Sequence, residues 1–234
     1  MRNKTGGKGV HETAVDTATL EAEVRNTIAQ GGDVKLAVQH MTVKALSSQH
    51  HDLESLRRIM TAVMQGVREG AQQNLQHSSA QTQTALAPIR DAVAGLDTAL
   101  AQFAEASKLA LEEATGRAQK FSNEELTRVR ADLESVEPVF LDVVQGSASS
   151  AQKAVSEILH DLVAHAKRNG TAVGSQLEGT LGALNHQMIS VGHTRFEAGM
   201  QLTHAITDLM RQIAAGVLTG IAERVKPDDK AKDG

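Results

Sequence analysis

Ten histidines are the residues of this chain best suited to metal or acid–base chemistry. If the C-terminal stretch is one helix, His186, His193 and His204 lie close to one line along it, because they are seven and eleven residues apart. Along the helix axis they are then roughly 10 and 16 Å apart, which is too far to share one ion. Only His193 and Glu197, four residues on, could give two ligands to one site. The sequence therefore offers these two as weak metal candidates and predicts no metal centre and no cofactor.

Other arrangements typical of enzymes are missing from the sequence. There is no Gly-x-Ser-x-Gly nucleophile motif, and the absence of cysteine excludes thiol nucleophiles, disulfides and thiolate zinc sites. Residues 174–179 lack the lysine that a phosphate-binding loop requires. His50 and His51 lie in a polar junction between two expected helices. We therefore expect no catalysis.

The composition favours helices joined along thin apolar seams. Hydrophobic residues make up 41% of the chain but aromatic residues only 2%, so the large rings that dominate most globular cores are nearly absent. The net charge of −4 provides no large basic surface and four phenylalanines provide no stacking platform, so nucleic-acid binding is not expected. No apolar run reaches the roughly 18 residues of a membrane span, and the N-terminus lacks the apolar core of a signal peptide. We expect a soluble, cytoplasmic protein without a transmembrane segment.

Apolar residues recur three and four apart along most of the chain, which predicts amphipathic helices. Residues 1–15 lack this spacing and are expected to form a disordered arm, and residues 16–71 an N-terminal helical region. Residues 72–85 are rich in Gln, Ser and Thr and predict a polar linker or a helix extension. A long-helix bundle is expected over residues 86–225, followed by a disordered charged tail at 226–234.

Helix starts and stops are signalled most clearly in the N-terminal region. Asp16 or Thr17, Asp33 and Asp52 can each accept backbone hydrogen bonds at the start of a helix. The paired glycines at residues 31–32 are expected to end the first helix.

The clearest apolar pattern is a seam of residues spaced three and four apart, as in a heptad repeat. It consists of Leu86, Ile89, Val93, Leu96, Leu100 and Phe103. Such a seam needs a partner helix, either within the chain or from a second copy. Pro88 is expected in the first turn of this helix, where its missing N–H removes no hydrogen bond.

Later helix boundaries are signalled by proline, glycine and serine. Ser122 and Glu125 form a capping box at an expected helix start. Pro138 predicts a kink or a short break. Turns are expected at residues 146–150, and a helix stop at residues 169–170.

Glycines are frequent from residue 170 onward and lie inside the apolar pattern. Each glycine in a helix interior costs up to about 1 kcal/mol relative to alanine. The region is therefore expected to be either closely packed against another backbone or labile. Gly-x-x-x-Gly sequences at residues 170–174 and 216–220 are expected to mark close helix crossings.

Over roughly residues 86–225, long amphipathic helices rich in Ala, Gln, Glu and Thr occur in a chain without Cys or Trp. This combination resembles bacterial phasins, which coat polyhydroxyalkanoate granules, and more distantly the exchangeable apolipoproteins. The segments DLESLRRIMTAVMQGVREGA, ALAPIRDAVAGLDTALAQFAEASKLALEE and FSNEELTRV also resemble an uncharacterised group of helical proteobacterial proteins. The phasin resemblance implies a granule or lipid surface as the binding partner. Neither resemblance implies a catalytic residue or a cofactor.

We expect an all-α protein, an elongated antiparallel bundle of long amphipathic helices with a short N-terminal helical region. The expected function is that of a non-enzymatic structural or interaction protein. It would coat an apolar surface, a polyhydroxyalkanoate granule or lipid, or self-assemble as a homo-oligomer through the seam. The alternative is a soluble coiled-coil adaptor or scaffold that binds a helical protein partner. Replacing Leu96 and Leu100 by Glu is expected to abolish assembly through the seam.

Overall fold

The computed structural model describes residues 16–48, 52–77, 82–116 and 123–192, together with residue 216 and residues 218–220. Seven helices with defined bounds lie in these ranges, and no strand occurs in them. The helices are α1 (Thr17–Gln30), α2 (Val34–Ser48), α3 (Leu53–His77), α4 (Thr82–Gly116), α5 (Asn123–Ser149), α6 (Lys153–Asn169) and α7 (Ala172–Gly192). The expectation of an all-α bundle is confirmed. The expected arm at 1–15 and tail at 226–234 lie outside the described residues.

The first three helices begin where capping side chains were predicted. Asp16, Asp33 and Asp52 each accept a hydrogen bond from a backbone N–H in the first turn of the helix that follows. The donors are the N–H groups of Ala18, Leu36 and Ser55, at 3.2, 3.1 and 2.7 Å from Oδ1. Gly31 and Gly32 have φ of +76° and +95°, which glycine adopts at low cost, and they end α1 as expected.

The prediction for Pro88 is wrong. Helix α4 begins at Thr82, so Pro88 is its seventh residue and lies inside the helix. Residues 82–85, which precede the apolar seam in α4, are mainly polar. Their types do not forbid a helix, but the apolar spacing alone does not signal one. Of the residues expected to form a polar linker or a helix extension, 72–77 continue α3 and 82–85 begin α4, and residues 78–81 lie outside the described ranges.

Helix α5 passes through Pro138 without a break and continues through Gly146 to Ser149. A proline inside a helix removes one backbone hydrogen bond and crowds the preceding turn. Here Val136 and Phe140, on either side of the proline, are both buried in the same core. Burial of the flanking turns on one surface favours a continuous helix, and the turn falls at residues 150–152, later than expected.

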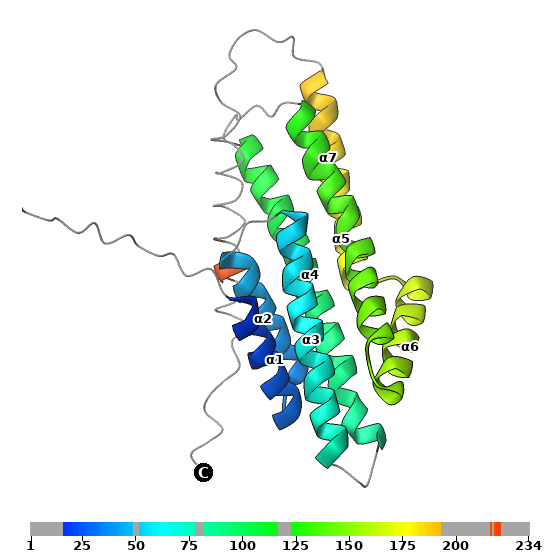
Figure 1. Cartoon of the computed structure of the whole chain (residues 1–234). Helices are drawn as coiled ribbons and strands as arrows, with labels where there is room; N and C mark the ends of the chain where they lie inside the picture. The colour runs from blue at the N-terminus through cyan, green and yellow to red at the C-terminus, as the bar shows by residue number, and fades with distance from the viewer. Residues whose placement is uncertain are drawn as a thin grey trace, which may run out of the picture.

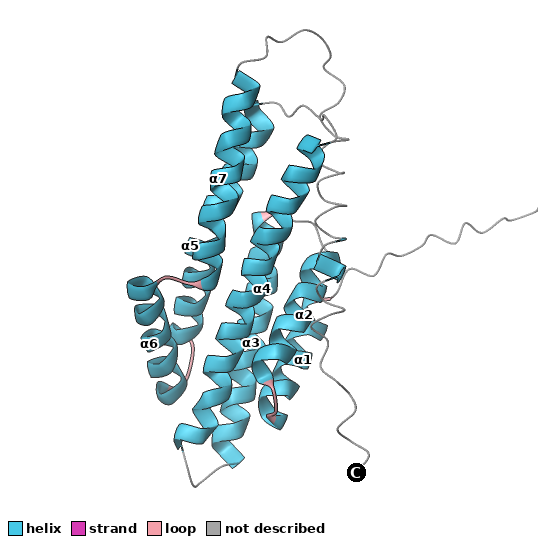
Figure 2. Ribbon diagram, turned by 180° about the vertical axis from the view of Figure 1, so that it is seen from behind, coloured by secondary structure: helices cyan, strands magenta, loops and turns pink. Residues whose placement is uncertain are grey.

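The helices lie side by side along one long axis (Figure 1). Helices α1, α3 and α5 run in one direction and α2, α4, α6 and α7 in the other, so successive helices are antiparallel up to α6. The most extensive contacts join parallel helices: α1 with α3, α2 with α4, and α4 with α7. Helix α6 packs beside α5 at one end of the bundle and α7 continues in the same direction beside the other end (Figures 1 and 2).

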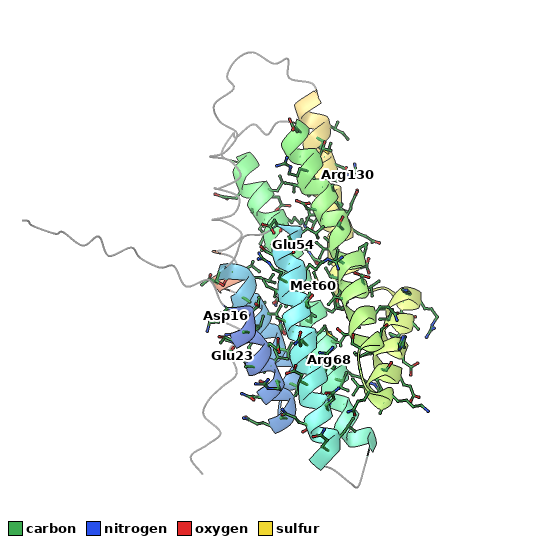
Figure 3. The ribbon with its side chains drawn as sticks, in the orientation of Figure 1. Asp16, Glu23, Glu54, Met60, Arg68 and Arg130 are labelled. Carbon is green, nitrogen blue, oxygen red and sulfur yellow. The ribbon has the colours of Figure 1, made fainter. Side chains whose placement is uncertain are left out.

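One continuous hydrophobic core runs through the bundle and receives side chains from all seven helices. The N-terminal helices share it with α4 to α7, so the core does not divide at residues 72–85. Figure 3 shows side chains filling the spaces between neighbouring ribbons. Met60 of α3 is fully buried, whereas Glu23 of α1 and Glu54 of α3 are exposed. Leu218, in the short described stretch near the C-terminus, is also buried in this core.

Candidate functional site

The apolar seam predicted as an assembly surface lies in the interior of the single chain. Its described side chains are 0 to 7% exposed: Ile89, Val93, Leu96, Leu100 and Phe103. Leu86 lies in α4, but its side chain is outside the described residues. Helices α2, α3 and α7 all contact α4. The seam therefore has partner helices within its own chain, which is one of the two arrangements the spacing allowed.

Because the seam is buried, a charged substitution in it would test the stability of the fold and not assembly between chains. Leu96 and Leu100 are both 0% exposed. Glutamate at either position would bury a carboxylate among apolar side chains, which is strongly unfavourable without a partner charge. The double change to Glu would therefore unfold the chain, and loss of assembly would follow from loss of the fold.

A polar junction joins α4 to the start of α7. The backbone N–H groups of Ala172 and Val173 donate hydrogen bonds to Asp97 of α4, at 2.8 Å to Oδ2 and 2.9 Å to Oδ1. Both donors belong to the first turn of α7, whose N–H groups have no partner within the helix. A carboxylate from a different helix thus caps α7 and also meets the positive end of its dipole.

A second carboxylate reaches the same junction from α5. The hydroxyl of Thr171 donates to Glu137, and its oxygen accepts the N–H of Gly174 at 2.9 Å. The Glu137 carboxylate lies directly over Gly174, where an added Cβ would overlap it. An added Cβ at Gly174 would displace the end of the flexible Glu137 side chain and so disturb its hydrogen bond with Thr171.

Burial raises the pKa of Asp97, and the nearby Glu137 adds to that rise. The hydrogen bonds from Val173 and Ala172 and the charge of Lys35 act in the opposite direction and lower it. Burial is the largest of these effects, so the pKa of Asp97 is raised. Removing the carboxylate from water disfavours its charged form. The cap is thus held at an electrostatic cost.

Further contacts along α7 also use polar groups. The side-chain amide of Gln176 donates to Glu105, and the hydroxyl of Thr180 donates to the backbone oxygen of Ala104 at 3.1 Å. Near the end of the bundle, Arg130 of α5 donates to Asn185 of α7 at 3.0 Å (Figure 3). Helix α7 is therefore attached to α4 and α5 by hydrogen bonds along much of its length.

A solvent-open hollow of about 430 Å³ lies beside this junction, between α5 and the α6–α7 connection. Its lining includes Glu134, Glu137, Glu178, Gly174, Leu177 and Leu181. Glu137 accepts a hydrogen bond from the Thr171 hydroxyl, and Glu134 forms an ion pair with Arg130 at 2.6 Å. Glu137 thus holds a contact between helices, whereas Glu134 pairs with a residue of its own helix.

The closest helix crossings lie at glycines that the sequence analysis did not single out. An added Cβ at Gly66 would lie 2.5 Å from the backbone oxygen of Glu21, and one at Gly70 would lie 2.6 Å from that of Arg25. These glycines of α3 form a Gly-x-x-x-Gly sequence against α1, and Gly95 of α4 is equally close to α2. The signal was present at residues 66–70, inside a pattern interpreted only as an apolar stripe.

The two Gly-x-x-x-Gly sequences that were predicted as crossings behave differently. An added Cβ would meet nothing within 4 Å at Gly170, Gly216 or Gly220. Only Gly174 is in close contact, and its neighbour is a side chain. The expectation of close backbone crossings at these positions is wrong for the described residues, because the glycines serve a helix end or face open space.

The weak metal candidates His193 and Glu197 lie outside the described residues, as do His50, His51 and His204. His186 is exposed on α7. Among the side chains that the structure describes, no three metal-ligating groups come together. The histidines are thus not gathered by the fold in this part of the chain.

Within the described ranges no helix has the length and apolarity needed to cross a bilayer. Two large apolar side chains are notably exposed there, Leu109 of α4 at 40% and Ile189 of α7 at 66%. Both lie on a pair of helices that contact each other. Scattered apolar residues of this kind are normal on protein surfaces.

The seven described helices with one shared core define an all-α helical bundle. Comparison with known protein families shows the family to which the chain belongs. The model of a family of unknown function, DUF6781, matches residues 10–227. The chain belongs to this family. No curated protein and no solved structure matches the chain.

Proposed function

We propose that this protein is a non-enzymatic interaction protein that works as a folded helical bundle and binds helical surfaces. The partner is another protein or a second copy of the chain. The observation that supports this proposal most is the burial of the apolar faces of all seven helices in one core. A folded bundle of this kind fits an adaptor or scaffold. The polar groups that the fold brings together support the non-enzymatic assignment, because Asp97, Glu137 and Thr171 are engaged in holding a helix end.

A surface coat is the second candidate, and the resemblance to phasins favours it. A helix that lies on lipid or on a polyhydroxyalkanoate granule must turn its apolar face toward that surface. In the closed bundle such faces are covered, so coating requires the helices to separate. Leu109 and Ile189, exposed on neighbouring helices, are a first point of contact in this case.

Circular dichroism with and without vesicles tests the proposal. Zwitterionic phosphatidylcholine vesicles and anionic phosphatidylglycerol vesicles are each added to the full chain, and helicity and the melting curve are recorded. The proposal expects the same helicity and the same cooperative melting in all three samples. Helicity that rises with lipid, together with flotation of the protein on vesicles, would overturn it and support the coat. The variant L109S/I189S should then float less if those two residues make the first contact.

A further inference from the structure

Helix α7 has a weak intrinsic tendency to stay helical. Its interior contains Gly174, Gly179 and Gly182, and a glycine destabilises a helix relative to alanine. The Glu137 carboxylate lies against Gly174, but an added Cβ at Gly179 or Gly182 would meet nothing within 4 Å. Packing therefore does not explain the last two glycines. They lower the stability of α7 without allowing any closer contact.

The hydrogen bonds at the start of α7 can be exchanged for hydrogen bonds to water. Its N-terminus is held by hydrogen bonds to Asp97, which water can replace once the helix leaves. The charged form of that carboxylate is disfavoured by its burial, so release of the helix relieves a cost. Among the described side chains of α7, three large apolar ones are buried, Val173, Leu177 and Leu184, and Leu181 and Met188 pack against the core while partly exposed.

The connection before α7 is suited to a hinge. Only Gly170 and Thr171 separate α6 from α7, and both helices run in the same direction (Figure 1). Gly170 has φ of +81° and no neighbour within 4 Å of an added Cβ. Rotation about a few backbone bonds there can redirect the residues of α7, while α6 stays beside α5.

We propose that α7 is an exchangeable helix, which leaves its own α4 and α5 and occupies the same place on a second copy of the chain. The proposal rests on the interaction function given above and names its partner. A second copy is the occupant because its α7 carries every matching group for Asp97, Glu105 and the Ala104 oxygen. Exchange of an identical element is a low-cost route to a dimer, since the contacts made are those already present in the monomer.

Thiol cross-linking between copies tests the exchange directly, because the chain contains no cysteine. Two single variants, E105C and Q176C, place one thiol on α4 and one on α7 at side chains that contact each other. The full-length variants are mixed and treated with a short bifunctional thiol reagent, and dimers containing one chain of each kind are quantified. The matched control is a mixture of E105C with E157C, whose thiol lies on an exposed position of α6.

The proposal expects mixed dimers several-fold above the control. A detached α7 has lost the packing that stabilises it as a helix, so it partly unfolds during exchange. Adding G179A and G182A to the Q176C chain should reduce the rate of mixed-dimer formation about fivefold for each substitution, because each alanine makes that unfolding less favourable. Mixed dimers at the control level, while the double variant E105C/Q176C cross-links within one chain, would overturn it.

Light scattering of the unaltered protein keeps the proposal testable if a thiol variant misfolds. Exchange predicts a dimer in equilibrium with the monomer that forms more slowly in the G179A/G182A chain. A chain that remains strictly monomeric at high concentration would contradict exchange. That result would not affect the vesicle experiment, which tests the interaction function. Failure of the exchange proposal is therefore distinguishable from failure of the proposed function.

Discussion

Asp97 of α4 accepts the backbone N–H of Val173 at 2.9 Å, although 76 residues separate the two. This hydrogen bond connects the middle of the central helix to the first turn of α7. It brings a carboxylate into a partly buried place where its charged form is disfavoured. The same contact therefore positions α7 and makes its position sensitive to protonation.

Stability should depend on pH through Asp97. Its pKa in the folded chain is above the ordinary value of 3.8, so the folded state binds more protons than the unfolded state between the two pKa values. The stabilisation from protonation is fully present below the unfolded pKa and is lost as pH rises through the folded pKa. Asp132 has a pKa raised mainly by burial as well and adds a slope of the same sign.

The contribution of Asp97 to the pH dependence of stability is measured by urea unfolding of the natural chain and of D97N at a series of pH values from below 3.8 upward. The difference in the free energy of unfolding between the two proteins should favour the natural chain most at low pH and shrink as pH rises. A difference that stays constant or grows with pH would contradict a raised pKa. Asp132 is present in both chains, so its slope cancels in the comparison.

Two leucines of α4 should differ sharply in their contribution to stability. Leu96 is 0% exposed and Leu109 is 40% exposed. Leu96→Ala removes buried methyl groups and leaves a cavity, so it should lower the free energy of unfolding by about 2 to 5 kcal/mol. Leu109→Ala, on the same helix, should change it by about 0.5 kcal/mol or less. Similar losses from both changes in denaturant melts would show that the seam is not covered in solution.

Two glycines in helix interiors should respond to alanine with opposite signs. At Gly66 an added Cβ would lie 2.5 Å from the Glu21 oxygen, so Gly66→Ala must push α1 away and should cost about 1 to 3 kcal/mol. At Gly146 of α5 nothing lies within 4 Å, so Gly146→Ala should stabilise by up to about 1 kcal/mol through helix propensity. Thermal melts of the two variants check this. Stabilisation by both would mean that α1 and α3 do not cross so closely.

The end of α1 should depend on one amide from α3. The side chain of Asn74 donates to the backbone oxygen of Ile28 at 2.7 Å, and that oxygen belongs to the last turn of α1, where carbonyls lack helical partners. Asn74→Ala should cost about 1 kcal/mol and speed amide hydrogen exchange in α1. The exposed neighbour Gln76, changed to Ala, is the control. Equal exchange in both variants would rule out a role for this hydrogen bond.

The helices of this fold were predictable from the sequence because their signals are local. Asp16, Asp33 and Asp52 cap helices within three residues of themselves, and the stripes follow the helical period. The assembly of the helices was not predictable in the same way. An apolar stripe accepts any partner stripe, so the pairing of α4 with α2 and α7 depends on contacts far apart in the chain.

The polar junction illustrates the same limit. Asp97 is not part of the apolar seam and does not precede a helix as a capping residue does. Its partner Val173 is 76 residues away. No local pattern singles out Glu137, although its carboxylate accepts the hydroxyl of Thr171 from 34 residues away. The glycines at 66 and 70 did carry a local signal, their Gly-x-x-x-Gly spacing. The same spacing at residues 170–174 and 216–220 marks no close backbone crossing, so the spacing alone does not locate one.

The central claim is that the chain works as a closed bundle with its apolar faces buried. Light scattering coupled to size exclusion, combined with small-angle X-ray scattering in the presence and absence of lipid vesicles, tests it most directly. The account predicts a discrete species, monomer or dimer, whose mass and scattering profile are those of a compact helical bundle and do not change with vesicles. An extended, polydisperse species that moves onto the vesicles would contradict it, and the surface coat would then be the better account of this protein.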